Sequence, residues 1–146
     1  MTPQWDASQR GTDERPRRQH VLFVVEDDVS TLDLLCEVAQ DAGWAAFGFT
    51  RLDEVRATLE QCQPTMLILD DNLPDGSGGD LARELREDPR THDMPTLVCT
   101  AAHPMRIAEI GAWAPVIPKP FDLDDLEGFL YAAARRETRL DQLAAG

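Results

Sequence analysis

The chain has 146 residues, a length that fits one domain with a core able to fold without disulfides or a structural metal. Its formal net charge is -13, so a phosphate-rich surface repels it and direct nucleic-acid binding is not expected. No apolar stretch approaches the roughly 20 residues of a membrane helix, and the N-terminus lacks the apolar core of a signal peptide. We therefore expect a cytoplasmic protein with no membrane insertion.

Residues 1–20 are rich in charge and have almost no apolar periodicity. Such a segment cannot offset its ordering entropy by burying side chains. We predict a flexible N-terminal arm over residues 1–20, followed by a single domain over residues 21–146.

From Val21 onward, short apolar runs alternate with amphipathic stretches. This pattern is typical of parallel strands covered by helices on both faces of a sheet. The sequence therefore predicts an α/β fold with a doubly wound sheet of five parallel strands and five helices. The predicted strands are residues 21–25, 45–49, 66–69, 96–99 and 116–117.

The amphipathic stretches predict the helices that follow each strand. Ser30 is a good N-cap for the first helix, and Gly43 stops it. The third helix ends at Asp88, because a residue before proline avoids helical geometry. The fourth is short. In chain order, the predicted helices cover about residues 30–43, 52–61, 80–87, 104–110 and 122 onward, the last with a buried stripe of Leu126, Leu130 and Ala133.

Polar residues follow four of the predicted strands. In an open parallel sheet, ligands bind beyond the carboxyl ends of the strands, so these residues are the candidates for chemistry. Carboxylates that converge there repel one another, and a hard cation such as Mg²⁺ relieves the repulsion. The candidates are Glu26, Asp27 and Asp28 after the first strand, Asp70, Asp71 and Asn72 after the third, Thr100 after the fourth and Lys119 after the fifth.

Asp70 is the predicted nucleophile of this set. A carboxylate can attack a phosphoryl group, because the transition state is loose and needs mainly positioning and charge neutralisation. We expect the metal to neutralise one phosphoryl oxygen, Lys119 to neutralise a second, and the Thr100 hydroxyl to donate a hydrogen bond to a third.

Four motifs at these positions together resemble the receiver domain of bacterial two-component response regulators: VLFVVEDD, LILDDNLPDGSG, LVCTAA and PKPF. The resemblance runs from Val21 to the end of the last helix and implies a flavodoxin-like fold. It implies a phosphoacceptor four residues before Pro74, which is Asp70 rather than Asp71. It also implies metal ligation by Glu26, Asp27, Asp70 and the backbone carbonyl of Asn72, a switch hydroxyl at Thr100 and a phosphate-binding Lys119.

The function that this resemblance implies is that of a stand-alone receiver. A histidine kinase or phosphotransfer protein donates a phosphoryl group, which Asp70 carries as a 4-aspartylphosphate, with Mg²⁺ as cofactor. Output passes through contact with a downstream protein whose identity is unknown. The implied protein is not an enzyme, beyond assisting its own phosphorylation and dephosphorylation. The peptide between Lys119 and Pro120 is expected to be cis.

The chain departs from the family pattern at three places. Val116 stands where the family usually has a Tyr or Phe that swings inward, three residues before Lys119. Thr100 and Lys119 are closer in sequence than is usual for the family, which predicts a truncated fourth helix. Asp71 places one more carboxylate beside the phosphoacceptor, and we expect it to point outward.

Two other functions stay open. A phosphorylation-independent interaction module with the same fold is the first, because Val116 and the short fourth helix put the usual switch in doubt. Formation of an acyl phosphate with a small donor discriminates between it and a phosphoacceptor. A Mg²⁺-dependent phosphohydrolase ranks last, since such enzymes need an aspartate two residues after the nucleophile, where Asn72 stands.

Overall fold

The computed structural model describes the backbone of residues 19–145 and the side chains of residues 19–137. The predicted arm over residues 1–20 lies outside the described residues, apart from its last two. The ring of His20 lies 5.2 Å from the ring of Trp44, and its Nδ1 lies 3.1 Å from Glu137 Oε2. His20 therefore contacts the start of the second strand and the last helix.

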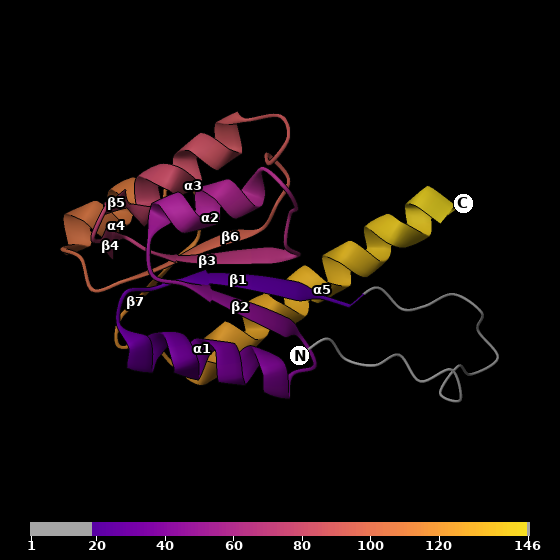
Figure 1. The fold of residues 1–146 in the computed structure, drawn as a ribbon, viewed down its shortest axis with the longest axis horizontal. Helices are drawn as coiled ribbons and strands as arrows, with labels where there is room; N and C mark the ends of the chain where they lie inside the picture. The colour runs from indigo at the N-terminus through magenta and orange to yellow at the C-terminus, as the bar shows by residue number, and fades with distance from the viewer. Residues whose placement is uncertain (1–18, 146) are drawn as a thin grey trace.

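Five parallel strands form the central sheet: β1 (Val21–Val25), β2 (Ala45–Phe49), β3 (Met66–Asp70), β6 (Thr96–Thr100) and β7 (Val116–Pro118). Their order is β2-β1-β3-β6-β7 (Figure 1). The five predicted strands are confirmed, and the last three extend one residue further at their carboxyl ends. β3 lies in the middle with all of its residues buried, which explains its continuous apolar run.

Five helices cover this sheet: α1 (Val29–Asp41), α2 (Leu52–Leu59), α3 (Gly78–Glu87), α4 (Pro104–Ile110) and α5 (Leu123–Ala145). In Figure 1, α1 and α5 lie on one face of the sheet, and α2, α3 and α4 lie on the other. This arrangement confirms the predicted doubly wound, flavodoxin-like α/β fold.

Each face of the sheet has its own hydrophobic core. Under α1 and α5, the predicted stripe of Leu126, Leu130 and Ala133 is buried against β1 and β3. Under α2 to α4, Leu81 of α3 and Ile110 of α4 pack on the other side. Each fully buried leucine contributes about 1.5–3 kcal/mol of transfer free energy, so these faces hold the helices in place.

The first helix begins earlier than predicted because Asp28, not Ser30, is its N-cap. Asp28 Oδ2 accepts hydrogen bonds from the Thr31 amide at 3.3 Å and the Thr31 hydroxyl at 2.5 Å. An ionised carboxylate is the stronger acceptor for these donors. The end of α1 is as predicted: Gly43 has a φ of 90°, in the left-handed region that favours glycine.

A short antiparallel hairpin that the sequence analysis did not predict precedes α3. It consists of β4 (Asn72–Leu73) and β5 (Gly76–Ser77). Ser77 then caps α3, since its Oγ accepts a hydrogen bond from the Asp80 amide at 3.2 Å. This cap starts α3 two residues before the predicted position, and the hairpin folds back toward the end of β3.

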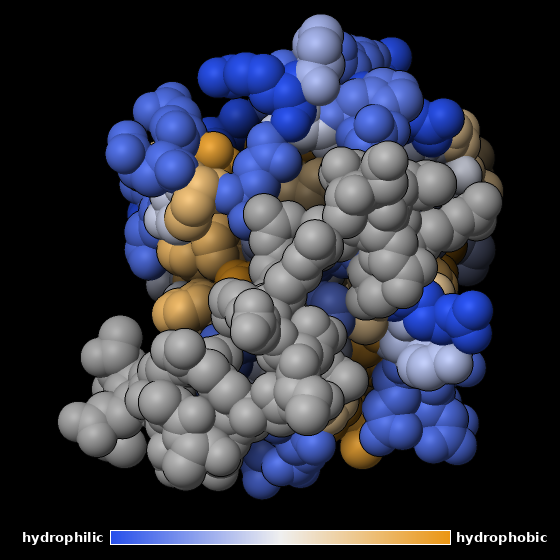
Figure 2. All heavy atoms as spheres, turned by 90° about the vertical axis from the view of Figure 1, so that its right-hand side faces the viewer, coloured by the Kyte–Doolittle hydropathy of each residue, from blue (hydrophilic) through white to orange (hydrophobic). Residues whose placement is uncertain are grey.

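Figure 2 shows the face on the right-hand side of Figure 1: hydrophilic residues cover its upper part, and hydrophobic residues form a smaller group at its left. Within residues 19–145, no helix combines the length and the apolar character that crossing a bilayer requires.

Candidate functional site

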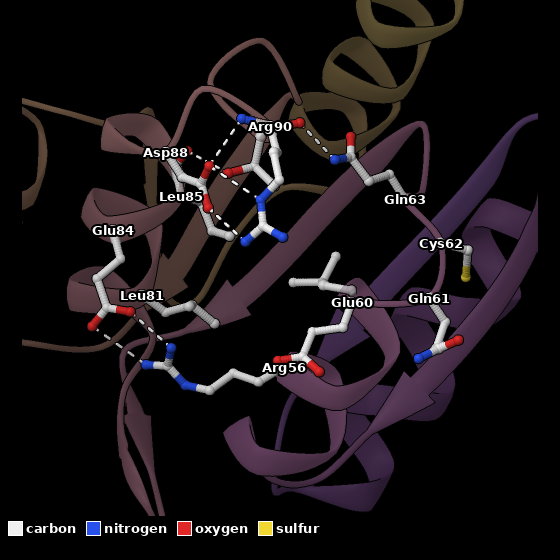
Figure 3. A pocket seen from close by; sticks show the side chains of 12 residues that line it. Arg56, Glu60, Gln61, Cys62, Gln63, Leu81, Glu84, Leu85, Asp88 and Arg90 are labelled. Carbon is white, nitrogen blue, oxygen red and sulfur yellow. Dashed lines mark hydrogen bonds and ion pairs between the residues drawn. The ribbon is translucent and has the colours of Figure 1, made fainter.

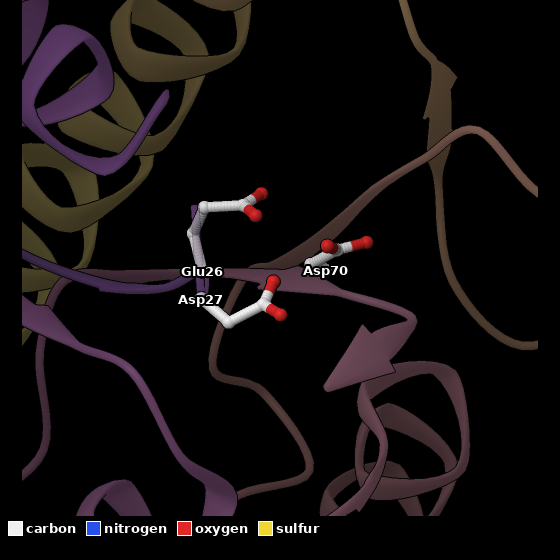
Figure 4. Close-up of side chains that lie close together, drawn as sticks. All are labelled: Glu26, Asp27 and Asp70. Atoms are coloured by element: carbon white, nitrogen blue, oxygen red, sulfur yellow. The ribbon is translucent and has the colours of Figure 1, made fainter. Parts of the chain in front are cut away.

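Three carboxylates converge at the carboxyl ends of β1 and β3. Each of Glu26, Asp27 and Asp70 offers an oxygen, and these oxygens lie within 4.8 Å of one another (Figure 4). The convergence follows from the sheet, because β1 and β3 are neighbours and Val25 pairs with Leu69 one residue before the cluster begins. The structure thus brings together three of the predicted metal ligands.

The carboxylates differ in their exposure. Glu26 is 2% exposed and Asp70 is 7% exposed, whereas Asp27 is open to solvent. Three hard oxygen donors with one solvent-facing edge suit a divalent cation that keeps some of its water, as Mg²⁺ does. The donor set therefore fits the predicted metal, with Asp27 as the accessible ligand.

Lys119, which follows β7, occupies the inner side of the cluster. Its Nζ lies 2.5 Å from Glu26 Oε2 and 3.4 Å from Asp70 Oδ2. Burial raises the pKa of Glu26, and the hydrogen bond from Lys119 acts in the opposite direction. Burial alone lowers the pKa of Lys119, but the hydrogen bond to Glu26 and the charge of Asp70 outweigh it and raise that pKa. The ammonium group therefore stays charged beside Asp70.

Thr100 is buried at the end of β6, next to β7. It pairs with Pro118 in the sheet, and its carbonyl accepts a hydrogen bond from the Lys119 amide at 2.8 Å. Its hydroxyl accepts a hydrogen bond from the Ala102 amide at 3.1 Å. Thr100 and Lys119 are thus adjacent, as predicted. The peptide between Lys119 and Pro120 is cis, which confirms that expectation.

The segment after β3 is packed tightly against the start of α3. The Asn72 amide donates a hydrogen bond to Asp70 Oδ1 at 3.3 Å, which places Asn72 beside the cluster. A Cβ added to Gly78 would lie 2.0 Å from the carbonyl oxygen of Asp70. Only glycine allows the first turn of α3 to come this close to the backbone of Asp70.

Asp71 is not part of the carboxylate cluster. It is directed toward α3 and α4, and its side chain is only 11% exposed, so it leaves the pocket as expected but is not solvated. Its Oδ1 accepts hydrogen bonds from the Ser77 hydroxyl at 2.5 Å and the Gly79 amide at 3.0 Å. Burial acts to raise the pKa of Asp71, but the hydrogen bonds from Arg106 and Ser77 outweigh it and hold that pKa low.

Arg106 of α4 is the partner of Asp71 that the sequence analysis missed. Its guanidinium binds the Asp71 carboxylate through two hydrogen bonds, of 3.1 Å from Nε and 3.0 Å from Nη2. The signal was present in the sequence: a second carboxylate directly after Asp70, close to the acidic cluster, is stabilised by a compensating cation. The identity of that cation was not predictable, because 35 residues separate Arg106 from Asp71.

The short fourth helix is confirmed, and hydrogen bonds hold the residues just after it against α3. The indole Nε1 of Trp113 donates a hydrogen bond to the carbonyl of Gly79 at 2.8 Å, and Arg86 binds the Trp113 carbonyl at 2.9 Å. Trp113 therefore packs the connection after α4 against α3. Val116 is half-buried against the same core.

A groove of about 380 Å³ lies elsewhere, between α2 and α3 (Figure 3). It is near the edge where β3 and β6 begin, so it is away from the carboxylate cluster. Two of its three carboxylates have charged partners: Glu84 binds Arg56 at 2.7 Å, and Asp88 binds Arg90 at 3.0 Å. The third, Glu60, is not part of a convergent acidic set like that of Glu26, Asp27 and Asp70.

Comparison with known sequences identifies similar proteins. The family model of the response regulator receiver domain matches residues 22–130. The phosphate regulon transcriptional regulatory protein PhoB of Rhizobium meliloti (strain 1021) is 34% identical over 119 residues, which are 79% of this chain and 52% of that protein. The chain spans about half the length of the curated relatives that it matches.

Solved structures share the fold. A putative response regulator from Chloroflexus aurantiacus J-10-fl has a TM-score of 0.69 and 26% identity, over 78% of this chain and 99% of that one. A CheY-like response regulator receiver domain protein from Methanospirillum hungatei JF-1 has a TM-score of 0.73 and 21% identity, over 84% of this chain and 99% of that one. The second likeness is an argument for the fold alone.

Proposed function

The chain belongs to the response regulator receiver domain family, and from this premise we propose that it accepts a phosphoryl group on Asp70. Receiver domains interact with histidine kinases or phosphotransfer proteins, and one of these is the proposed donor. Output passes through contact with a downstream protein, in the cytoplasm and without direct nucleic-acid binding. That the chain acts as a stand-alone receiver stays a prediction.

The proposed reaction forms one bond and breaks another. A carboxylate oxygen of Asp70 bonds to phosphorus while the bond between phosphorus and the donor's leaving group breaks, which gives an acyl phosphate. Lys119, already 3.4 Å from Asp70 Oδ2, pairs with one phosphoryl oxygen. The Thr100 hydroxyl, at the adjacent strand end, donates a hydrogen bond to another.

Mg²⁺ is the proposed cofactor. When bound, it supplies the positive charge that neutralises the remaining phosphoryl oxygen. Asp27, Asp70 and the backbone carbonyl of Asn72 are the proposed ligands, and Glu26 supports them from its buried position. Lys119 offsets part of the negative charge of Glu26 and Asp70 when no cation is bound.

The observation that carries this proposal is the position of Lys119 among the three carboxylates. A solvated acidic surface would not hold an ammonium 2.5 Å from a carboxylate that is 2% exposed. The arrangement leaves one exposed carboxylate for a cation and one lysine for an anion. Both are needed to accept a phosphoryl group on a carboxylate.

Phosphorylation by acetyl phosphate in Mg²⁺ tests the proposal. The acyl phosphate is reduced with borohydride and located by mass spectrometry. We expect the label on Asp70, no label in Asp70→Asn, and continued labelling of Asp70 in Asp71→Asn. A label on Asp71 overturns the assignment of the nucleophile, and no label on the wild-type protein overturns the proposed function.

A phosphorylation-independent receiver-like module is the second candidate. The observation in its favour is Val116, which is short and half-buried where the family has an aromatic switch residue. The same labelling experiment separates the two, since this candidate predicts no acyl phosphate. A Mg²⁺-dependent phosphohydrolase is less favoured because Asn72 stands in place of the required acid, and it predicts continuous release of phosphate.

A further inference from the structure

The Asp71–Arg106 pair joins the segment after the phosphoacceptor to α4. The two hydrogen bonds from Nε and Nη2 make a bidentate contact, the strongest geometry for a guanidinium and a carboxylate. The side chain of Arg106 is 24% exposed and that of Asp71 is 11% exposed. Solvent therefore screens this pair less than it screens the surface ion pairs of the protein.

Arg106 also reaches the first turn of α3. Its Nη2 donates to the Ser77 hydroxyl at 2.7 Å and to Asp80 at 2.9 Å, and its Nη1 lies 3.3 Å from Glu109. Ser77 in turn donates to Asp71. These contacts hold the Asp71 carboxylate on the side of α3 and α4, away from Asp70.

We propose that Arg106 is a positioning residue of the phosphoryl-acceptor site that acts through Asp71. It keeps the Asp71 side chain out of the pocket and cancels its charge beside Asp70. The proposal rests on the proposed function, because it assigns Arg106 a part in phosphoryl acceptance.

The reason lies in the charge of the pocket. Glu26, Asp27 and Asp70 already make it strongly negative, and Lys119 is the single cation in contact with them among the residues that the structure describes. An uncompensated carboxylate at Asp71 adds to that potential. The added charge attracts Mg²⁺ and repels an anionic phosphodonor, so it changes the two affinities in opposite directions. If the substitution instead loosens the segment after β3, the binding of Mg²⁺ and the binding of the phosphodonor both become weaker.

Two measurements distinguish these effects: the Mg²⁺ dissociation constant from an NMR titration, and the second-order rate constant with acetyl phosphate at saturating Mg²⁺. In Arg106→Met we expect the dissociation constant and the rate constant both to fall by about threefold. Asp71→Asn removes one negative charge next to Asp70 and leaves Arg106 paired with Asp80 and Glu109, so both constants rise. The double variant Asp71→Asn/Arg106→Met returns both toward the wild-type values.

Two further variants serve as controls. Arg83→Met removes one positive charge from α3, where Arg83 pairs with Glu87 at 3.3 Å, and it leaves both constants unchanged. Arg106→Lys keeps the charge without the bidentate contact, and it recovers most of the rate. If Arg106→Met does not fold, Asp71→Asn and Arg106→Lys carry the same comparison.

The proposal is overturned if Arg106→Met weakens Mg²⁺ binding and slows phosphorylation together, or if it behaves like Arg83→Met. A wild-type protein that takes no phosphoryl group from acetyl phosphate contradicts the proposed function instead. In that case the Mg²⁺ titration still tests the role of Arg106, because the Mg²⁺ dissociation constant is measured without phosphorylation.

Discussion

Lys119 Nζ lies 2.5 Å from Glu26 Oε2, although 93 residues separate the two in the chain. Glu26 is buried, and Lys119 is its only cationic partner among the described residues. The pair joins the ends of β1 and β7, which are separated in the sheet by β3 and β6. The positive charge at the centre of the site is therefore provided by the most distant strand.

Replacing Lys119 is expected to destabilise the fold in a way that a cation reverses. Lys119→Met leaves buried Glu26 and Asp70 without a counter-charge, and we expect the free energy of unfolding to fall by about 2 kcal/mol. Added Mg²⁺ recovers part of that loss because the cation supplies positive charge to the same carboxylates. Urea denaturation with and without Mg²⁺ measures this. Arg135→Met, at an exposed position on α5, is the control, and an equal loss in both conditions contradicts the assignment.

Asp27 is expected to be the ligand on which Mg²⁺ affinity depends most. It is the exposed member of the cluster, so it meets a hydrated cation first. Asp27→Ala should raise the Mg²⁺ dissociation constant by about tenfold, measured by NMR titration. Asp28→Asn is the matched control, since the Asp28 side chain caps α1. If Asp27→Ala binds as well as wild type, the metal site lies elsewhere.

Phosphorylation is expected to alter α4 by backbone movement rather than by rotation of an aromatic ring. Drawing the Thr100 hydroxyl toward a phosphoryl group moves the connection to α4, and Val116 is too stiff at χ1 to fill the space that this leaves. Amide hydrogen exchange with and without beryllofluoride should show altered protection across residues 101–113. Changes confined to residues 70–78 would mean that output uses another face.

Asp75 is expected to make stability depend on pH. Its two oxygens accept hydrogen bonds from the amides of Leu52 at 2.8 Å and Asp53 at 3.0 Å, so the hairpin caps α2 from a distance. These bonds lower the pKa of Asp75 in the folded protein. The stabilising contribution of the charged form is therefore complete above the ordinary aspartate pKa of about 3.9 and is lost as pH falls through the lower folded value.

The comparison of Asp75→Asn with wild type tests this. We expect a lower melting temperature for the variant at neutral pH, because asparagine keeps one acceptor but loses the charge. The difference in melting temperature between wild type and Asp75→Asn should disappear as the pH falls below the ordinary aspartate range. Glu127→Gln, at an exposed position of α5, corrects for net charge. A difference in melting temperature that does not change with pH would contradict the role assigned to the Asp75 carboxylate.

Local patterns were sufficient to predict most of the fold. The strands and the fourth helix were predicted because apolar runs and helical periodicity depend on residues a few positions apart. The hairpin of β4 and β5 was not predicted, and α2 ends at Leu59, two residues before its predicted end. Two helix starts were also misplaced, where Asp28 and Ser77 act as caps. At each of these starts several polar residues compete for the same free amides, and the sequence does not rank them.

The carboxylate cluster was also predictable, because parallel strands end at one edge and bring Glu26, Asp27 and Asp70 together. The sequence by itself thus determined the fold and which carboxylates converge at the edge of the sheet. Only the tertiary structure decided which groups bind the other acidic side chains: the Arg106 guanidinium for Asp71, and the backbone amides of α2 for Asp75. These partners come from other elements of the chain, and the packing of α2 and α4, which no local pattern encodes, sets their distances.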